Sequence, residues 1–432
     1  MDITVAGAGL AGCEAAWSAA ERGARVTLIE QKPLRYSPAH KYEGFAELVC
    51  SNSLKAARVN SAAGLLKAEM EMLGSLTVRC AKKCAVAAGG ALAVDRKDFS
   101  DLVTKYINEH PLITVEHREL TEIPKTDTPV IIATGPLTDG ALAEDIARVT
   151  GGYLHFHDAA APIVTAESID MEKAFFASRY GKGGDDYINC PFNKEEYERF
   201  HDALIHAESA ELHDFEKSER DDFKVYEGCM PIEVLAKRGA DAVRYGAMKP
   251  VGLTDPHTGH RPWAAVQLRK ENSEGSMYNI VGFQTNLKFG EQKRVFSMIP
   301  GLENAEFVRY GVMHRNSFID SPRLLEKRLC LKNDRRLFFA GQITGTEGYM
   351  ESAACGIMAG INAACGELIL PQITMIGALI NYITDESVTE FQPMGANMGI
   401  LPPFGEEIRD KAMRYQAMAD RSLGYISSAL PT

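Results

Sequence analysis

The sequence has few of the features that mark membrane, zinc-binding or disulfide-stabilised proteins. No uncharged apolar run reaches the length of a bilayer; the nearest stretch, residues 353–370, contains Asn362 and Glu367. The nine cysteines are odd in number, irregularly spaced and without a C-x-x-C pair. We therefore expect reduced thiols in a cytoplasmic protein, and no metal site.

Internal repeats and low-complexity segments are also missing, and the remaining composition is ordinary for a globular protein. The 432 residues are 45% hydrophobic and 24% charged, which allows two or three domains around a large core. A net charge of −11 argues against non-specific coating of nucleic acid, but not against a local basic site. A glycine motif begins close to Met1, so we expect no signal peptide before it.

That motif is the fingerprint of a dinucleotide-binding fold. An apolar strand, residues 3–6, is followed by a helix and by a second strand that ends at Glu30. The loop between the first strand and the helix is G-x-G-x-x-G, with residues Gly7, Ala8, Gly9, Leu10, Ala11 and Gly12. Its glycines permit a tight turn and close approach of a pyrophosphate to the helix N-terminus. We expect Glu30 to accept hydrogen bonds from ribose hydroxyls.

Two later segments favour FAD over NAD as the dinucleotide. Residues 128–136 form an apolar strand that leads into Gly135, and residues 337–342 form another that leads into Gly341. A small-residue helix, residues 353–364, follows the second strand and would place its N-terminus near a flavin ring. The simpler interpretation is one more strand–helix unit of the sheet, and both can be true.

The order of these segments predicts a split domain. We expect an α/β protein whose FAD-binding, doubly wound Rossmann-type domain (residues 1–150 and 310–432) is interrupted by an inserted α+β domain (residues 151–309). The insert contains an acidic helical run at 208–222 and strand-like segments at 278–285 and 307–313. We expect it to cover the flavin and hold a substrate, and a terminal helix to span residues 406–428.

Two cysteines precede segments that favour a helix start. Cys50 is followed by the N-cap residues 51–53, from which we expect a helix toward residue 72. Cys229 precedes Pro231, which suits a first helical position, so we expect a helix over 231–238. A helix dipole would stabilise the thiolate in both cases. The commoner role of a cysteine is apolar packing, which we assign to Cys190.

Taken together, the chain resembles the bacterial folate- and FAD-dependent tRNA (uracil-5-)-methyltransferases along nearly its whole length. The matching segments are residues 7–16, 38–40, 45–54, 88–96, 131–138, 158–164, 223–239, 248–253, 310–316, 341–352 and 391–394. The departures are few: Gly395, Met398, Lys55 and Cys355 stand where the family usually has Asn, Phe, Arg and Ser.

The resemblance implies an activity and roles for individual residues. Methylenetetrahydrofolate would supply a carbon to C5 of a uridine, most plausibly in the T-arm of tRNA, and FAD reduced by NAD(P)H would supply a hydride. It implies that Cys229 is the nucleophile toward C6 and Cys50 the base at C5, and that Tyr349 lies beside the flavin. No motif indicates a membrane or an obligate protein partner.

RNA binding would have to come from local clusters of positive charge. A cluster in a sequence is more often a solvated face, and basic residues at a helix end can complement its dipole. Around the expected active site, we nevertheless identify candidates for phosphate contact. They are Lys237, Arg238, His314, Arg315, Arg414 and Arg421.

Four other functions stay open from the sequence. Ribosomal RNA could be the substrate of the same chemistry. The related flavoenzymes that modify wobble uridine share the fold, but they are longer, and here only about ninety residues follow Gly341. A non-catalytic flavin-fold protein that binds RNA or a metabolite would be favoured if either candidate cysteine were missing, and a small-molecule flavin oxidase would leave the segment around Cys229 unexplained.

Overall fold

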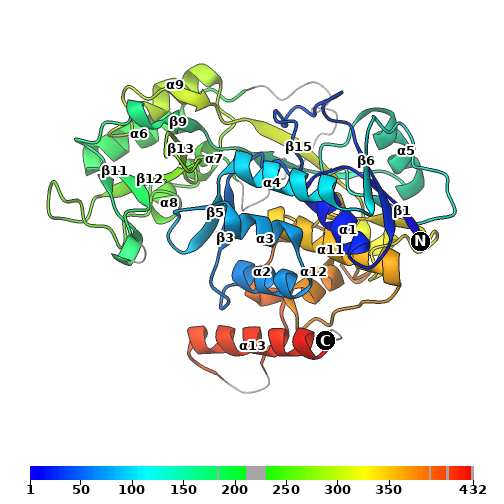
Figure 1. Cartoon of the computed structure of the whole chain (residues 1–432). Helices are drawn as coiled ribbons and strands as arrows, with labels where there is room; N and C mark the ends of the chain where they lie inside the picture. Colours follow the sequence, from blue (N-terminus) through cyan, green and yellow to red (C-terminus); the bar gives the residue numbers. More distant parts are fainter. Residues whose placement is uncertain (182–183, 211–229, 389–390, 405–407, 430–432) are drawn as a thin grey trace.

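A five-stranded parallel sheet lies at the centre of the larger part of the molecule, in the computed structural model, which describes residues 1–181, 184–210, 230–388, 391–404 and 408–429 (Figure 1). Its order is β16-β7-β1-β2-β6, and every neighbouring pair is parallel. The strands are β16 (Leu337–Phe339), β7 (Val130–Ile132), β1 (Asp2–Ala6), β2 (Arg25–Glu30) and β6 (Ile113–His117). The predicted strand–loop–helix–strand unit and both later strands are therefore confirmed.

Two helices pack tightly against one another beside this sheet. All eleven residues of α1 (Leu10–Ala20) are buried, because α1 lies between the sheet and α11 (Tyr349–Cys365). Small residues make this packing close: a Cβ on Gly356 of α11 would lie 2.1 Å from the carbonyl oxygen of Ala11. The predicted small-residue helix is thus confirmed, and it begins four residues earlier than expected.

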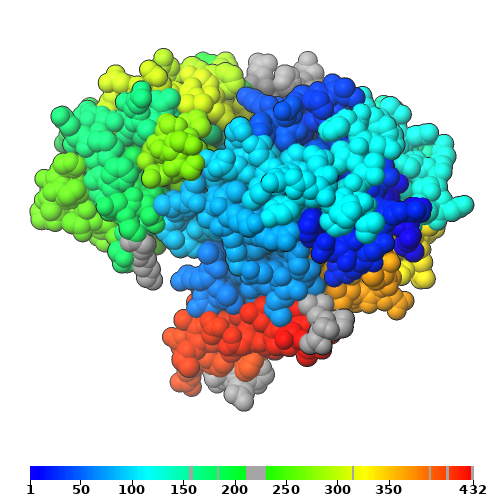
Figure 2. All heavy atoms as spheres, viewed as in Figure 1, coloured from blue at the N-terminus to red at the C-terminus, as the bar shows by residue number. Residues whose placement is uncertain are grey.

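The remaining helices of this part surround the sheet and a small three-stranded sheet, β3-β5-β4. The small sheet contains β3 (Ser53–Ala56), β5 (Ala91–Val94) and β4 (Ala85–Val86). The helices are α2 (Ala62–Met72), α3 (Leu76–Lys83), α4 (Arg96–Glu109), α5 (Gly140–Thr150), α10 (Ser321–Leu324), α12 (Met375–Ile383) and α13 (Lys411–Ala429). Helix α13 packs on α2 and lies at the lower edge of the molecule in Figures 1 and 2.

A second region is built on a six-stranded antiparallel sheet with the order β10-β11-β12-β13-β9-β14. The strands are β10 (Phe175–Phe176), β11 (Tyr187–Phe192), β12 (Ala264–Lys270), β13 (Met277–Ile280), β9 (Ile163–Thr165) and β14 (Phe307–Arg309). The helices are α6 (Lys194–Ile205), α7 (Ile232–Ala236), α8 (Ala242–Tyr245) and α9 (Phe289–Phe296). This region has its own hydrophobic core, separate from the core around the parallel sheet.

An antiparallel pair of strands lies between the two regions. It consists of β8 (Leu154–Ala159) and β15 (Met313–Phe318). Two separate cores agree with a split domain, but the boundaries at residues 150 and 310 stay a prediction. Among the described residues, no helix is both long and apolar enough to cross a membrane.

Several expected elements differ in the structure. Residues 51–53 do not start a helix: β3 follows, and α2 begins only after Ser61, whose Oγ accepts from the Gly64 N–H. Lys55 has a φ of +63°, which interrupts any helix there. The segment 307–313 splits into β14 and β15, the strand at 278–285 ends at Ile280, and most of the acidic run 208–222 lies outside the described residues.

Candidate functional site

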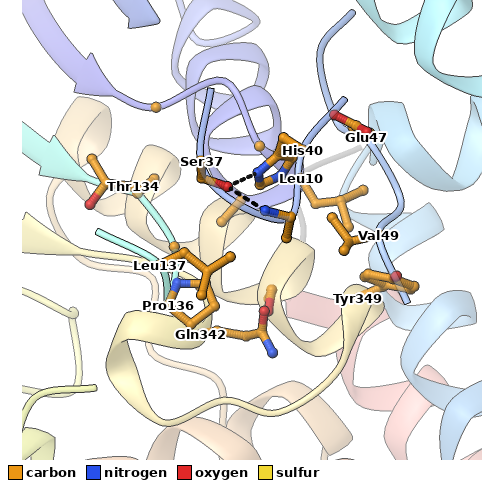
Figure 3. Close-up of a pocket in the computed structure, with 18 of the residues that line it drawn as sticks. Leu10, Ser37, His40, Glu47, Val49, Thr134, Pro136, Leu137, Gln342 and Tyr349 are labelled. Atoms are coloured by element: carbon orange, nitrogen blue, oxygen red, sulfur yellow. Dashed lines mark hydrogen bonds between the residues drawn. The ribbon is translucent and has the colours of Figure 1, made fainter. Parts of the chain in front are cut away.

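A cavity of about 480 Å³ opens at the carboxyl ends of β1, β2 and β7 (Figure 3). Ligands bind at this edge in open parallel sheets. The lining includes Cys50 and every predicted cofactor-binding residue except Gly12: Gly7, Ala8, Gly9, Leu10, Ala11, Glu30, Gly135, Gly341 and Tyr349. The sequence motifs therefore converge on one site although they are spread over 340 residues of chain.

The glycine loop allows α1 to pack closely against it on one side and a ligand to approach its backbone on the other. Gly7 has a φ of +94°, and a Cβ on Gly12 would lie 1.7 Å from the Gly7 carbonyl oxygen, so α1 rests directly on the loop. A Cβ on Gly9 would meet no atom within 4 Å, so this backbone faces open space. Gly12 thus shapes the loop from behind, while Gly9 leaves room for a phosphate.

Glu30 contributes to the shape of the loop itself. One carboxylate oxygen, Oε2, accepts from the Ala8 N–H at 2.7 Å, and the other accepts from the Lys32 N–H at 2.8 Å. Each oxygen keeps a second lone pair, so the carboxylate can still accept from a ribose hydroxyl. The role of Glu30 toward ribose stays a prediction.

The opposite side of the cavity is suited to the rest of a dinucleotide. Gly341 has a φ of +85°, and a Cβ there would lie 2.8 Å from the Ala11 side chain. The Ser352 Oγ, on the first turn of α11, is buried and has no hydrogen-bond partner among the described residues. A polar ligand at this helix N-terminus would satisfy such a group, so the residues present fit FAD.

A histidine stands over the same cavity (Figure 3). The His40 Nδ1 lies 2.6 Å from the Ser37 Oγ. Burial lowers the pKa of His40, which keeps the imidazole neutral near pH 7 and able to accept or donate a hydrogen bond. His40 lies in one of the segments that resemble the family, and the sequence alone predicts no role for it.

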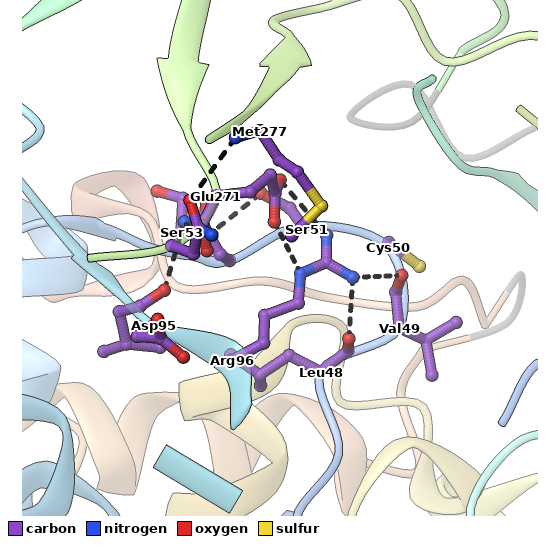
Figure 4. A network of polar contacts seen from close by, with 12 residues as sticks. Leu48, Val49, Cys50, Ser51, Ser53, Asp95, Arg96, Glu271 and Met277 are labelled. Atoms are coloured by element: carbon purple, nitrogen blue, oxygen red, sulfur yellow. Dashed lines mark hydrogen bonds and ion pairs between the residues drawn. The ribbon is translucent and has the colours of Figure 1, made fainter. Parts of the chain in front are cut away.

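Cys50 lies in an irregular segment held by a half-buried arginine, Arg96 (Figure 4). Arg96 Nη1 donates to the carbonyl oxygens of Leu48 and Val49 at 2.9 and 3.0 Å. Its Nε also forms an ion pair with the Glu271 Oε2 at 2.7 Å, and the Glu271 side chain is only 2% exposed. Arg96 starts α4 and Glu271 follows β12, so this pair joins the two regions beside Cys50.

The prediction that a helix dipole stabilises the Cys50 thiolate is wrong, because no helix begins directly after Cys50. Guanidinium groups provide the positive charge near Cys50 instead. Burial lowers the pKa of Arg309 most, and the nearby positive charge of Arg96 lowers it further. Cys50 and Tyr349 act in the opposite direction and raise it. Two arginines are therefore close enough to influence, and be influenced by, the Cys50 thiol.

Tyr349 binds the same segment from the first residue of α11. Its hydroxyl oxygen accepts from the backbone N–H groups of Cys50 at 2.7 Å and Ser51 at 3.2 Å. Burial raises the pKa of Tyr349 far above its usual value, so the phenol stays protonated. The ring lines the cavity, as expected for a residue beside a flavin, but that role stays a prediction.

Cys229 lies outside the described residues, which resume at Met230. The helix after it is shorter than predicted and has Pro231 at its N-cap. The Ile232 N–H donates to the carbonyl oxygen of Gln284 at 2.7 Å, and Gln284 lines the cavity. The start of α7 is thus attached to the cavity wall.

Buried Glu233 strengthens that attachment. Its carboxylate accepts from the Thr285 hydroxyl at 2.8 Å and from the Asn286 N–H at 2.7 Å. Burial raises its pKa although these donors oppose the shift.

The RNA-binding candidates are in different situations. Lys237 and Arg238 are exposed at the end of α7. Arg414 donates to the Ile408 carbonyl oxygen, and Arg421 donates to the carbonyl oxygens of Pro402 and Pro403. The last two therefore hold the terminal segment together, which is a structural role that their sequence spacing did not reveal. The side chains of His314 and Arg315 are not among those described.

Sequence reasoning missed a set of residues that build the Cys50 segment. Arg269 Nε donates to the Asn52 Oδ1 at 3.0 Å, and its Nη2 donates to the Ser51 Oγ at 2.8 Å. Arg96 and Glu271 belong to the same network. The available signal was the Asp95-Arg96 pair directly after a strand, within a segment already assigned to the family, but no spacing links it to Arg269.

The comparisons with known proteins agree with this geometry. Residues 2–368 match the family described as glucose inhibited division protein A. The methylenetetrahydrofolate–tRNA-(uracil-5-)-methyltransferase TrmFO of Acetivibrio thermocellus is 58% identical over 427 residues, 98% of this chain and 97% of that protein. The protein of the same name from Desulforamulus reducens is 57% identical and covers 98% and 96%.

The solved structures confirm the predicted fold class. GidA of Aquifex aeolicus, in its form II crystal, has a TM-score of 0.70 at 18% identity and covers 99% of this chain and 73% of that one. This likeness concerns the fold alone, whereas the identities above concern the family. The chain therefore belongs to the glucose inhibited division protein A family and, within it, to the methylenetetrahydrofolate–tRNA-(uracil-5-)-methyltransferases.

Proposed function

We propose that the protein transfers a one-carbon unit from 5,10-methylenetetrahydrofolate to C5 of a uridine in the T-arm of tRNA and reduces it to a methyl group. The names of relatives that match along nearly the whole chain support the folate donor and the tRNA substrate. The single structural observation that carries the proposal is that half-buried Cys50 lines the same cavity as the dinucleotide motif. Neither ribosomal RNA nor wobble-uridine modification has comparable support.

The residues of the chain divide the chemistry between them. The Cys229 thiolate adds to C6 of the uracil, and C5 then bonds to the one-carbon unit. Cys50 removes the C5 proton, and the bond from the one-carbon unit to the folate nitrogen breaks, so tetrahydrofolate leaves and an exocyclic methylene remains at C5. When this methylene is reduced, the C6–sulfur bond breaks and Cys229 is released. Tyr349 accepts from the backbone N–H of Cys50, and Arg96 holds the two residues before it, so together they position the thiol. Bound FAD, reduced by NAD(P)H, would supply the hydride that completes the methyl group.

A fluorinated substrate separates the two cysteines. With tRNA that carries 5-fluorouridine, no proton can leave C5, so the adduct through C6 is trapped. We expect Cys229→Ala to form no covalent adduct with this tRNA. We expect Cys50→Ala to form the adduct but to transfer no methyl group to ordinary tRNA. Denaturing gels and nucleoside mapping measure the two outcomes.

Two other cysteines provide controls. Cys365 is exposed and Cys190 is buried in the second core, so Cys365→Ala should keep both activities and Cys190→Ala at least part of them. An adduct formed by a protein that lacks both Cys229 and Cys50 would refute the assignment. Methyl transfer from S-adenosylmethionine alone would refute the folate donor.

We also propose that the protein acts in the cytoplasm. None of the eight cysteines that the structure describes forms a disulfide bond, which suits a reducing compartment where tRNA is present.

A further inference from the structure

An arginine on α8 lies near two aromatic rings, Tyr245 of the same helix and Trp263 directly before β12. The guanidinium carbon of Arg244 lies 3.9 Å from the centre of the Trp263 ring, and its Nε donates to the Trp263 carbonyl oxygen at 2.8 Å. The centre of the Tyr245 ring is 5.8 Å from the same guanidinium, and Tyr245 is 72% exposed. Trp263 is partly buried against the second core, so Arg244 links the exposed Tyr245 ring to an indole that the fold holds in place.

A second exposed tyrosine is held beside the next loop in a strained backbone conformation. Tyr180 has a φ of +59° and is 63% exposed. A Cβ on Gly252 would lie 3.0 Å from two of its ring carbons and 3.1 Å from a third, so the ring rests on the glycine backbone. The Tyr180 N–H donates to the Gly252 carbonyl oxygen at 2.9 Å. Strain that presents a ring to solvent is expected at a functional surface.

The loop from Tyr245 to Gly252 connects these two groups and adds a cation. Arg179 donates to the carbonyl oxygens of Lys249 and Val251, which holds the loop against Tyr180. The Lys249 side chain is exposed and has no partner among the described residues. We name the set of Tyr180, Arg244, Tyr245, Lys249 and Trp263 the aromatic–basic face. The acidic residue in contact with it is Asp241, 3.3 Å from Arg244.

The aromatic–basic face is connected to the candidate active site by a short path. The N-terminus of α7 is bonded to Gln284 in the cavity wall. Helix α7 has five residues, which span about 7.5 Å, and α8 follows after a short turn and packs on it. In Figure 1, α8 lies below α7, in the left part of the molecule.

We propose that the aromatic–basic face binds the tRNA substrate, with Tyr245 and Tyr180 stacking on unpaired bases and Lys249 contacting phosphate. The proposal rests on the proposed function. The enzyme can reach C5 of a stacked uridine only when that part of the tRNA unfolds locally. The neighbouring bases then lose their stacking partners. Exposed aromatic rings next to cations are the surface that such bases bind. In a chain with a net charge of −11, a local excess of positive charge also selects where RNA can approach.

The experiment uses the full-length protein with bound FAD and an unmodified tRNA transcript. We expect Tyr245→Ala to raise KM for tRNA about tenfold while kcat stays within about twofold, because stacking contributes to binding and not to chemistry. Tyr245→Phe should restore the wild-type KM. Lys249→Ala should reduce the slope of log Kd against log salt by about one, measured by fluorescence anisotropy.

Tyr425→Ala on α13 and Lys125→Ala between β6 and β7 are the matched controls, since both residues are exposed and lie in the other region. They should leave KM and the salt slope unchanged. Wild-type affinity for tRNA in both Tyr245→Ala and Lys249→Ala would overturn the proposal and indicate that this face meets another class of partner. If the wild-type protein binds tRNA but transfers no methyl group, the proposed function fails, while the anisotropy of the variants still decides whether the face binds RNA.

Discussion

The two regions of the molecule use their residues in opposite ways. The body around the parallel sheet makes its site from backbone: glycines at positions 7, 9, 12 and 341, helix N-termini, and carboxylates that accept from N–H groups. The inserted region presents side chains instead, such as exposed Tyr245 and Lys249. The body therefore offers a preformed cavity, and the insert an exposed surface. Substitutions should separate accordingly into loss of cofactor and loss of RNA affinity.

The largest effect should come from the glycine loop. In Gly12→Ala, the new Cβ would lie 1.7 Å from the Gly7 carbonyl oxygen, so α1 and the loop must separate. We expect protein purified without flavin and unable to bind added FAD, measured by its absorbance spectrum. Gly424→Ala is the control: this glycine lies in α13 with no atom within 4 Å of a Cβ, and alanine there should be neutral or stabilise by up to about 1 kcal/mol. A yellow Gly12→Ala protein would show that the loop tolerates more than its geometry suggests.

The next largest effect should come from the Arg96–Glu271 ion pair, which connects the two regions. Arg96→Met leaves the buried carboxylate of Glu271 without its ion-pair partner, and we expect the free energy of unfolding to fall by about 3–5 kcal/mol. The double variant Arg96→Met, Glu271→Met removes both charges and should recover much of this loss in urea unfolding. If the single variant is as stable as wild type, the pair does not hold the Cys50 segment.

The sequence predicted the body better than the insert, and the reason is physical. Close approach of backbone needs glycine at fixed spacing, so Gly7, Gly9 and Gly12 carry the geometry in the sequence itself. The conformation of Cys50 depends instead on Arg96, Arg269 and Glu271, which are distant in the chain. Local preference favoured a helix at residues 51–53, but tertiary hydrogen bonds to Asn52 determine the observed structure.

The same contrast explains the basic clusters. A cluster of basic residues in the sequence does not show whether their side chains form hydrogen bonds within the protein. Arg421 donates hydrogen bonds to the carbonyl oxygens of Pro402 and Pro403, whereas Lys249 is exposed and has no partner among the described residues. Only the folded structure distinguishes them.

A smaller effect should follow from pH and belong to the body alone. Burial raises the pKa of Glu69 to about 7, although Ser422 of α13 and two N–H groups at the start of α12 donate to it. Because the folded pKa lies above the unfolded one, this carboxyl favours folding at low pH, and its contribution is lost as the pH rises through about 7. From about pH 5.5 to about pH 8.5, wild type should lose about 2 kcal/mol relative to Glu69→Gln in chemical unfolding. Parallel pH profiles of the two proteins would contradict the raised pKa.

The smallest effect compares one cation from each region. Lys237 is exposed at the end of α7 in the insert, and we expect Lys237→Ala to lower the salt slope of tRNA binding by about one without changing thermal stability. Arg421→Ala in the body should do the reverse, because it removes donors from two carbonyl oxygens: the salt slope should stay and the unfolding temperature should fall by a few degrees. Filter binding at several salt concentrations and calorimetry measure the two quantities. A reduced slope in Arg421→Ala would place RNA on the body as well and would remove the distinction between the regions.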